Sequence, residues 1–186
     1  MRERSLRFSS RLVVVLLLAA LPGTAFGSTY APVADFSPVH GNPHCRFTSL
    51  HESFLKDWTP PAGFFKIPPY PKAILLSAMP SKTAHIQGKE YRTFPSAVLL
   101  SSDSPQQIIQ FYQKQLGPAW YQTQHLGIIY LYQMPRPVQS GEELTQRIMN
   151  RPGHTPHIAL DTRLSPCDLH IAKEAKTRIS VVSAPR

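Results

Sequence analysis

Histidine and cysteine side chains gather near residue 40, where His40 and His44 stand four positions apart and Cys45 follows. Imidazole nitrogen and thiolate sulfur are ligands that zinc and copper favour in proteins. The spacing therefore predicts a candidate metal site formed by His40, His44 and Cys45. A second pair, His154 and His157, offers two further nitrogen ligands.

Cys45 has a competing role, because the chain contains two cysteines and the other one is Cys167, near the C-terminal end. In an oxidising compartment two such cysteines form a disulfide by default. A Cys45–Cys167 bond would tie the N-terminal segment to the end of the chain. It would also remove the Cys45 thiolate from any metal site, so the disulfide and the metal site exclude each other. We favour the disulfide.

A third interpretation makes Cys45 a nucleophile. The segment resembles the H-G-C-[IV]-R region of peptidoglycan L,D-transpeptidases through His40, Gly41, His44, Cys45 and Arg46. The resemblance implies a Cys-dependent enzyme acting on cell-wall peptides, but Pro43 and His44 stand where that family has serine and glycine. A nucleophile also needs a positioned base and oxyanion donors, which an extended arm does not supply. We therefore expect no enzyme and assign no catalytic residue.

The first 27 residues have the pattern of a secretory signal peptide. Four arginines precede an apolar run over residues 12–21, Pro22 and Gly23 end that run, and small residues stand near position 27. The run is too short for a membrane-spanning helix, which needs about 20 apolar residues. We expect cleavage after residue 27 and a periplasmic or secreted protein without a transmembrane helix.

The positive charge of the chain is spread out rather than concentrated. The expected cleavage removes four of the 20 basic residues and one of the 11 acidic residues, so the net charge falls from +9 to +6. The remaining lysines and arginines alternate with acidic residues and form no basic run of the kind that follows nucleic acid. We expect no specific nucleic-acid binding.

A helix over residues 105–116 organises the remainder of the chain. Ser104 and Gln107 form a capping box around Pro105, which suits the first helical position, and Gly117 with Pro118 ends the helix. Apolar residues recur at helical spacing along one side. A strand-like run, residues 96–101, leads into this helix.

Aromatic residues follow the helix in two extended runs that turn near residues 125–127. Four of these residues are candidates for lining a ligand groove, with packing in the core as their competing role: Trp120, Tyr121, Tyr130 and Tyr132. Before the helix, residues 73–79 and 91–101 read as antiparallel neighbouring strands, connected by a loop over residues 80–88.

The chain divides into an arm, residues 28–67, and a domain, residues 68–186. The arm contains a short amphipathic helix that begins with a capping box at Ser49, and a proline-rich connector follows it. The domain ends with a helix that begins at Ser140 and a three-strand meander over residues 157–163, 168–172 and 177–183. The expected fold is α+β, with an antiparallel sheet of about six or seven strands and two or three helices packed mainly on one face.

One segment resembles a known domain. Residues 70–73 read Y-P-K-A before a strand, and residues 103–112 read D-S-P-Q-Q-I-I-Q-F-Y at the start of the helix. This is similar to a small α+β domain of uncharacterised bacterial secreted proteins and lipoproteins, in which a Y-P-G-A-like turn precedes a strand. Lys72 stands where that pattern has glycine. The resemblance covers residues 68–134 and implies fold and compartment, without an active site.

The expected function is therefore binding rather than catalysis. The Rossmann, P-loop, nucleophile-elbow, H-E-x-x-H and EF-hand patterns are absent from the sequence. We expect a periplasmic or secreted accessory protein, without a cofactor, that binds an envelope protein, a peptide or a small ligand. The alternatives are a zinc- or copper-binding protein that uses the arm, and the Cys45-dependent enzyme.

Overall fold

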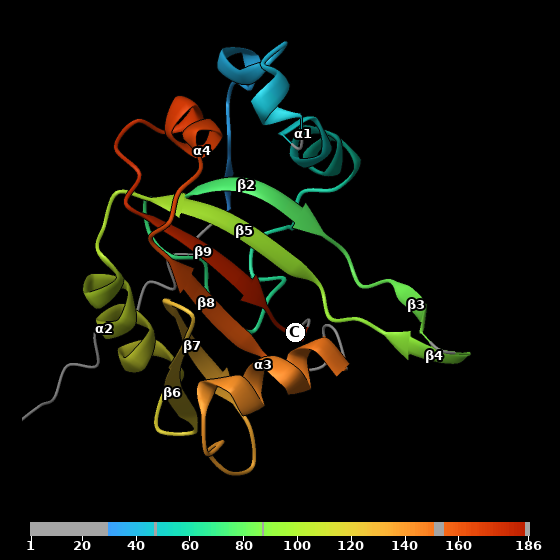
Figure 1. Ribbon diagram of the computed structural model, residues 1–186, viewed down its shortest axis with the longest axis vertical. Helices are drawn as coiled ribbons and strands as arrows, with labels where there is room; N and C mark the ends of the chain where they lie inside the picture. Colours follow the sequence, from blue (N-terminus) through green and yellow to red (C-terminus); the bar gives the residue numbers. More distant parts are fainter. Residues whose placement is uncertain (1–29, 47, 87, 151–154, 185–186) are drawn as a thin grey trace, which may run out of the picture.

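Figure 1 shows the computed structural model, which describes residues 30–184 except residues 47, 87 and 151–154. The expected signal peptide and His154 lie outside the described residues. The elements are, in order, β1 (Ala31–Pro32), η1 (Ser37–Val39), η2 (Pro43–Cys45), α1 (Thr48–Asp57), β2 (Ile74–Met79), β3 (Thr83–Ile86), β4 (Lys89–Arg92), β5 (Ser96–Ser101), α2 (Pro105–Leu116), β6 (Trp120–His125), β7 (Ile128–Gln133), α3 (Gly141–Asn150), β8 (His157–Asp161), α4 (Pro166–Ile171) and β9 (Thr177–Val182).

Seven strands of the described chain form one sheet in the order β1-β2-β5-β9-β8-β7-β6. The two-residue strand β1 pairs in parallel with β2, and every other neighbouring pair in this sheet is antiparallel. The α+β fold class is confirmed. The expected pairing of β2 with β5 and the expected hairpin of β6 and β7 are confirmed as well.

One face of the sheet carries the largest buried cluster of the described chain. Alternate residues of a strand point to the same face, and four residues that are neighbours in the strand register are each no more than 1% exposed: Leu75, Leu99, Ile179 and Leu160. Helix α2 packs on this face through Ile108 and Tyr112. Phe65 and Ile67, from the proline-rich connector, pack into the same cluster.

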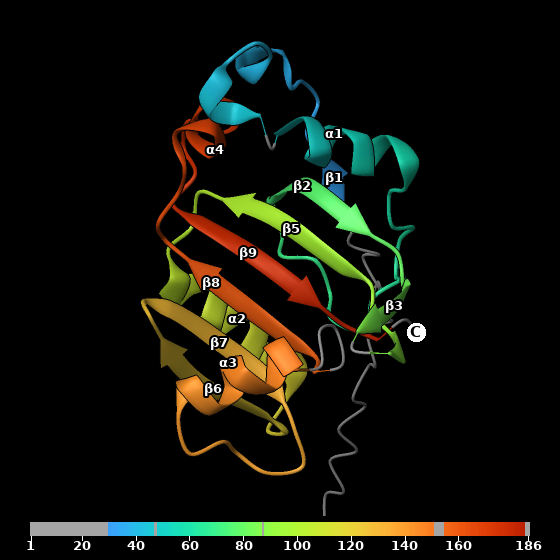
Figure 2. The same ribbon diagram turned by 45° about the vertical axis from the view of Figure 1, so that its right-hand side comes forward.

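The opposite face is covered by other helices. Leu144 of α3 packs against Tyr130 and Tyr132, which alternate along β7 with Leu131 of the α2-covered face. Figure 2 shows α3 in front of the sheet and α2 behind it. Helices α2 and α3 therefore lie on opposite faces of the sheet, whereas packing mainly on one face was expected. The physical reason is that β7 is apolar at both sets of alternating positions, so each face needs a cover.

Helix α2 begins and ends where the sequence predicts. The Ser104 hydroxyl accepts a hydrogen bond from the Gln107 backbone N–H at 3.4 Å, and the Gln107 side chain accepts one from the Ser104 N–H at 3.0 Å. Ser49 was expected to cap α1, but that helix begins at Thr48, and the Ser49 hydroxyl donates to the Arg46 carbonyl. A single capping-box pattern is thus a weaker indicator than the combined signals at α2.

Two segments differ from expectation. The middle strand of the expected meander, over residues 168–172, lies in the helix α4, because Ser165 and Asp168 form a capping box around Pro166. As a result β8 and β9, which flank α4 in the chain, pair directly. The expected loop over residues 80–88 instead contains β3 and the turn into β4, and these two strands pair as a separate hairpin.

The two halves of the Y-P-K-A and D-S-P motif meet in space. The Tyr70 hydroxyl donates to the Asp103 carboxylate at 2.8 Å, and the Tyr70 ring lies 5.1 Å from that of Phe111. Lys72 has φ of 62°, the left-handed conformation that favours glycine. The turn therefore keeps a conformation suited to the glycine of the look-alike pattern although lysine occupies the position.

The described part of the arm packs against the sheet. Tyr30, next to β1, belongs to the same buried cluster as α2. Leu55 of α1 and Trp58, the residue after this helix, pack at the edge of that cluster. None of the helices in the described ranges is long and apolar enough to cross a bilayer.

Candidate functional site

Cys45 and Cys167 form a disulfide that joins η2 to α4, with their Cα atoms 5.6 Å apart. Both residues are buried and pack against Val39. The predicted pairing is confirmed. With its sulfur bonded to Cys167, Cys45 supplies neither a thiolate ligand nor a nucleophile.

The histidines of the arm have other partners. Nε2 of His40 lies 2.8 Å from a carboxylate oxygen of Glu52 in α1, whereas His44 is exposed and its backbone N–H donates to Asn42. His157 is buried, with Nδ1 2.7 Å from the Thr155 carbonyl oxygen. Across the described residues, no three or more histidine, cysteine or acidic side chains gather as a metal site would require. The predicted set of His40, His44 and Cys45 is thus not assembled as a metal site.

The four aromatic residues predicted to line a groove lie on two different faces. Tyr130 and Tyr132 are 9% and 1% exposed beneath α3, and the Tyr132 hydroxyl accepts a hydrogen bond from the Val138 N–H. Tyr121 packs against Tyr132 with ring centres 5.8 Å apart. Trp120 points to the other face, because it is adjacent to Tyr121 in the same strand. Only Trp120 of the four borders a cavity described below.

Trp120 lines a cavity of about 430 Å³ where α2 ends, β6 begins and β7 and β9 end. We call this cavity the Trp120 groove, and its lining residues are Lys66, Ile67, Gln115, Leu116, Trp120, Gln133, Pro156, Ser183 and Ala184. Residues as far apart in the sequence as Lys66 and Ala184 therefore meet at one end of the sheet.

Backbone hydrogen bonds hold the walls of the Trp120 groove together. The Lys66 N–H donates to the Ala184 carbonyl at 3.3 Å, and the Gln133 N–H donates to the Pro156 carbonyl at 3.0 Å. The Ile67 N–H donates to the Ser183 hydroxyl at 3.3 Å. The wall segments are thus tied to one another before any ligand arrives, which lowers the entropic cost of binding.

The side chains in the Trp120 groove combine apolar and polar recognition. Ile67, Leu116 and the half-buried indole of Trp120 supply apolar surface. The exposed side chains of Lys66, Gln115 and Gln133 make no hydrogen bond within the described chain, so an ammonium group and two carboxamides are available to a ligand. The lining is thus about evenly apolar and polar, and its polar groups can fix the orientation of a small ligand.

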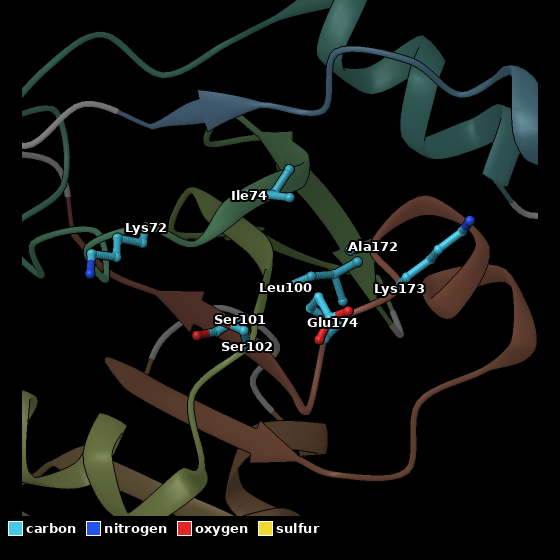
Figure 3. Close-up of a pocket in the computed structure, with 9 residues that line it drawn as sticks. Lys72, Ile74, Leu100, Ser101, Ser102, Ala172, Lys173 and Glu174 are labelled. Atoms are coloured by element: carbon cyan, nitrogen blue, oxygen red, sulfur yellow. The ribbon is translucent and has the colours of Figure 1, made fainter.

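Two other cavities of the described chain lack this combination of an aromatic ring and free polar side chains. Figure 3 shows the first, a cavity of about 240 Å³ between the Lys72 turn and the segment after α4. Lys72 and Lys173 extend away from each other there, and its lining contains no aromatic side chain. The other, of about 380 Å³, lies beside His40 and Cys45. Two of its polar groups are already engaged, since His40 contacts Glu52 and the Asn42 side chain caps η2.

Sequence reasoning identified Trp120 but missed the polar residues of the groove. Lys66 lies among the prolines of the connector, and Gln115 and Gln133 lie at the ends of α2 and β7. Exposed lysine and glutamine are common on every protein surface, so no local pattern marks these three. Only the folded chain brings them together.

No protein-family model matches the chain, and neither a curated protein nor a solved structure matches it. The resemblance of residues 68–134 to a domain of secreted proteins stays a prediction.

Proposed function

We propose that this protein is a non-catalytic binding or accessory protein that works outside the cytoplasm and holds its ligand in the Trp120 groove. The observation that carries the proposal is the joint presence, in one cavity of about 430 Å³, of a half-buried indole and three polar side chains without internal partners. Such a surface supports an orienting contact with a polar organic molecule.

The compartment is supported by two independent features. Disulfides persist in oxidising environments outside the cytoplasm, and the Cys45–Cys167 bond is buried. Residues 1–27 carry the basic, apolar and small-residue pattern of a secretory signal. Export would account for both features.

The lining favours binding over catalysis. Ser183 is 1% exposed, and its hydroxyl already accepts from the Ile67 N–H and donates to the Ala184 carbonyl. No carboxylate or imidazole belongs to the described lining, so Lys66 has no acid or base beside it there. A catalytic nucleophile requires such a neighbour within hydrogen-bond reach.

A fragment screen followed by NMR tests the proposal. A mixture of small sugars, amides and carboxylic acids should shift the indole N–H signal of Trp120 and the side-chain signals of Gln115 and Gln133. The variant Gln133→Ala should weaken these shifts. Gln122→Ala is the matched control, because Gln122 is an exposed carboxamide on β6 outside the groove lining. Hits confined to the cavity beside Lys72 and Lys173, or to the arm, would overturn the proposal.

A further inference from the structure

The charge in the described lining of the Trp120 groove is positive only. Lys66 is the one ionisable side chain in its described lining, and it is exposed. Neither of its polar neighbours carries charge, since Gln115 and Gln133 offer carboxamides that both donate and accept hydrogen bonds. A ligand in this groove therefore meets a positive charge that the other lining side chains leave uncompensated.

The end of α2 limits how much negative charge the groove tolerates. Gln115 and Leu116 belong to the last turn of that helix, whose unpaired carbonyl groups carry partial negative charge. A dianion such as phosphate usually binds where arginines or a helix N-terminus gather. A singly charged carboxylate needs one ammonium group and a few neutral donors, which is what this lining offers.

We propose that the Trp120 groove selects ligands that carry a single carboxylate beside an apolar or planar part, with the carboxylate at Lys66 and the planar part at Trp120. This inference rests on the proposed function and specifies the chemical class of the ligand. Gln115 and Gln133 donate their amide hydrogens to polar groups between the two ends of the ligand.

Matched acid and amide pairs test the inference on the full chain. The probes are 3-phenylpropanoate and 3-phenylpropanamide, which differ in charge but hardly in shape, and the readout is the Trp120 indole N–H signal. The acid should bind about fivefold more tightly at low salt, as expected for one ammonium–carboxylate contact near the surface. The preference should shrink as sodium chloride is added, because salt screens exposed charges.

Variants of Lys66 test whether its ammonium group causes the preference for the acid over the amide. Lys66→Gln should remove the difference between acid and amide, and Lys66→Arg should retain it. Lys114→Gln, an exposed lysine of α2 outside the groove lining, should leave it unchanged.

The outcomes separate the two proposals. Equal binding of acid and amide, or an unchanged preference in Lys66→Gln, would overturn the carboxylate inference and leave the binding function in place. The same holds if neither probe shifts Trp120 while other fragments do. A groove that binds no fragment at all would overturn both.

Discussion

The hydroxyl groups of the core tyrosines have unequal surroundings. The hydroxyls of Tyr30 and Tyr112 are buried and have no hydrogen-bond partner in the described chain, whereas that of Tyr70 donates to Asp103. Burial raises the pKa of Tyr112 well above its usual value, because a phenolate would be poorly solvated there. Burial and the Asp103 contact together raise the pKa of Tyr70 to about 12. All three phenols therefore stay neutral over the physiological range.

This difference predicts opposite effects of removing a hydroxyl. Tyr112→Phe should leave the free energy of unfolding unchanged or slightly higher, because a buried polar group without a partner is unfavourable. Tyr70→Phe should lower it by about 1 to 2 kcal/mol, since the Asp103 carboxylate loses a donor. Urea denaturation of both variants measures this, and an equal loss in the two variants would contradict the assignment.

His157 predicts a dependence of stability on pH. Burial lowers the pKa of His157 below 6.5, so the folded state resists a proton that the unfolded chain accepts. The contribution of His157 is thus complete above about pH 6.5 and is lost as the pH falls below that value. His157→Phe should flatten the fall in unfolding free energy between about pH 7 and pH 5. The matched control is His170→Phe, an exposed position, whose profile should follow the wild type.

At the scale of elements, the β6–β7 hairpin contains a turn that its sequence fits poorly. Leu126 and Gly127 both have positive φ, of 48° and 80°, as a type I′ turn requires. Leucine is strained in this conformation, and the Leu126 side chain is 74% exposed, so packing offers little compensation. Leu126→Asn should therefore raise the free energy of unfolding by about 1 kcal/mol.

Thermal denaturation checks this prediction, with Leu126→Val as the comparison. A β-branched side chain is still less compatible with positive φ, so valine should lower the melting temperature while asparagine raises it. A shift of the same sign in both variants would show that side-chain polarity, and not backbone conformation, decides stability at this turn.

Elements with several agreeing local signals were predictable, and those that depend on distant partners were not. Helix α2 has a cap, a proline, a periodic face and a stop signal, and its bounds match the prediction. Helix α4 has a capping box as well, but the alternation of Leu169 and Ile171 favours a strand over residues 168–172, and six residues are too few to show helical periodicity. The β3–β4 hairpin lacks a strongly apolar alternation, so the sequence of its first strand favours a loop.

The residues of the candidate site also differ in how far the sequence predicts them. Trp120 stands out in the sequence because it is one of two tryptophans, but its predicted companions Tyr130 and Tyr132 pack beneath α3 instead. Their orientation follows from strand alternation together with a helix that covers the second face. The contribution of Lys66 depends on contacts with Ala184, which is more than a hundred residues away. Such distant pairings leave no local pattern.

At the scale of the whole molecule, the disulfide connects residues 122 positions apart. Closing so long a loop restricts the unfolded chain, which the chain-entropy model values at about 4 to 5 kcal/mol. Replacing both cysteines, Cys45→Ser with Cys167→Ser, should lower the free energy of unfolding by up to that amount. Reductant should destabilise the wild type in guanidinium denaturation and leave the double variant unchanged. Equal sensitivity of both proteins to reductant would contradict this role.

The same bond sets how the molecule would respond to tension. A force applied at the two ends travels through the Cys45–Cys167 link and bypasses every element between them, including α2 and the β6–β7 hairpin. Only the flanks can lengthen, and the C-terminal flank contains β9, the middle strand of the sheet. The described N-terminal flank joins the sheet through the two-residue edge strand β1, whereas β9 pairs with a strand on each side. Stretching the oxidised protein would therefore detach β1 before it drew out β9, and extension would end at the disulfide.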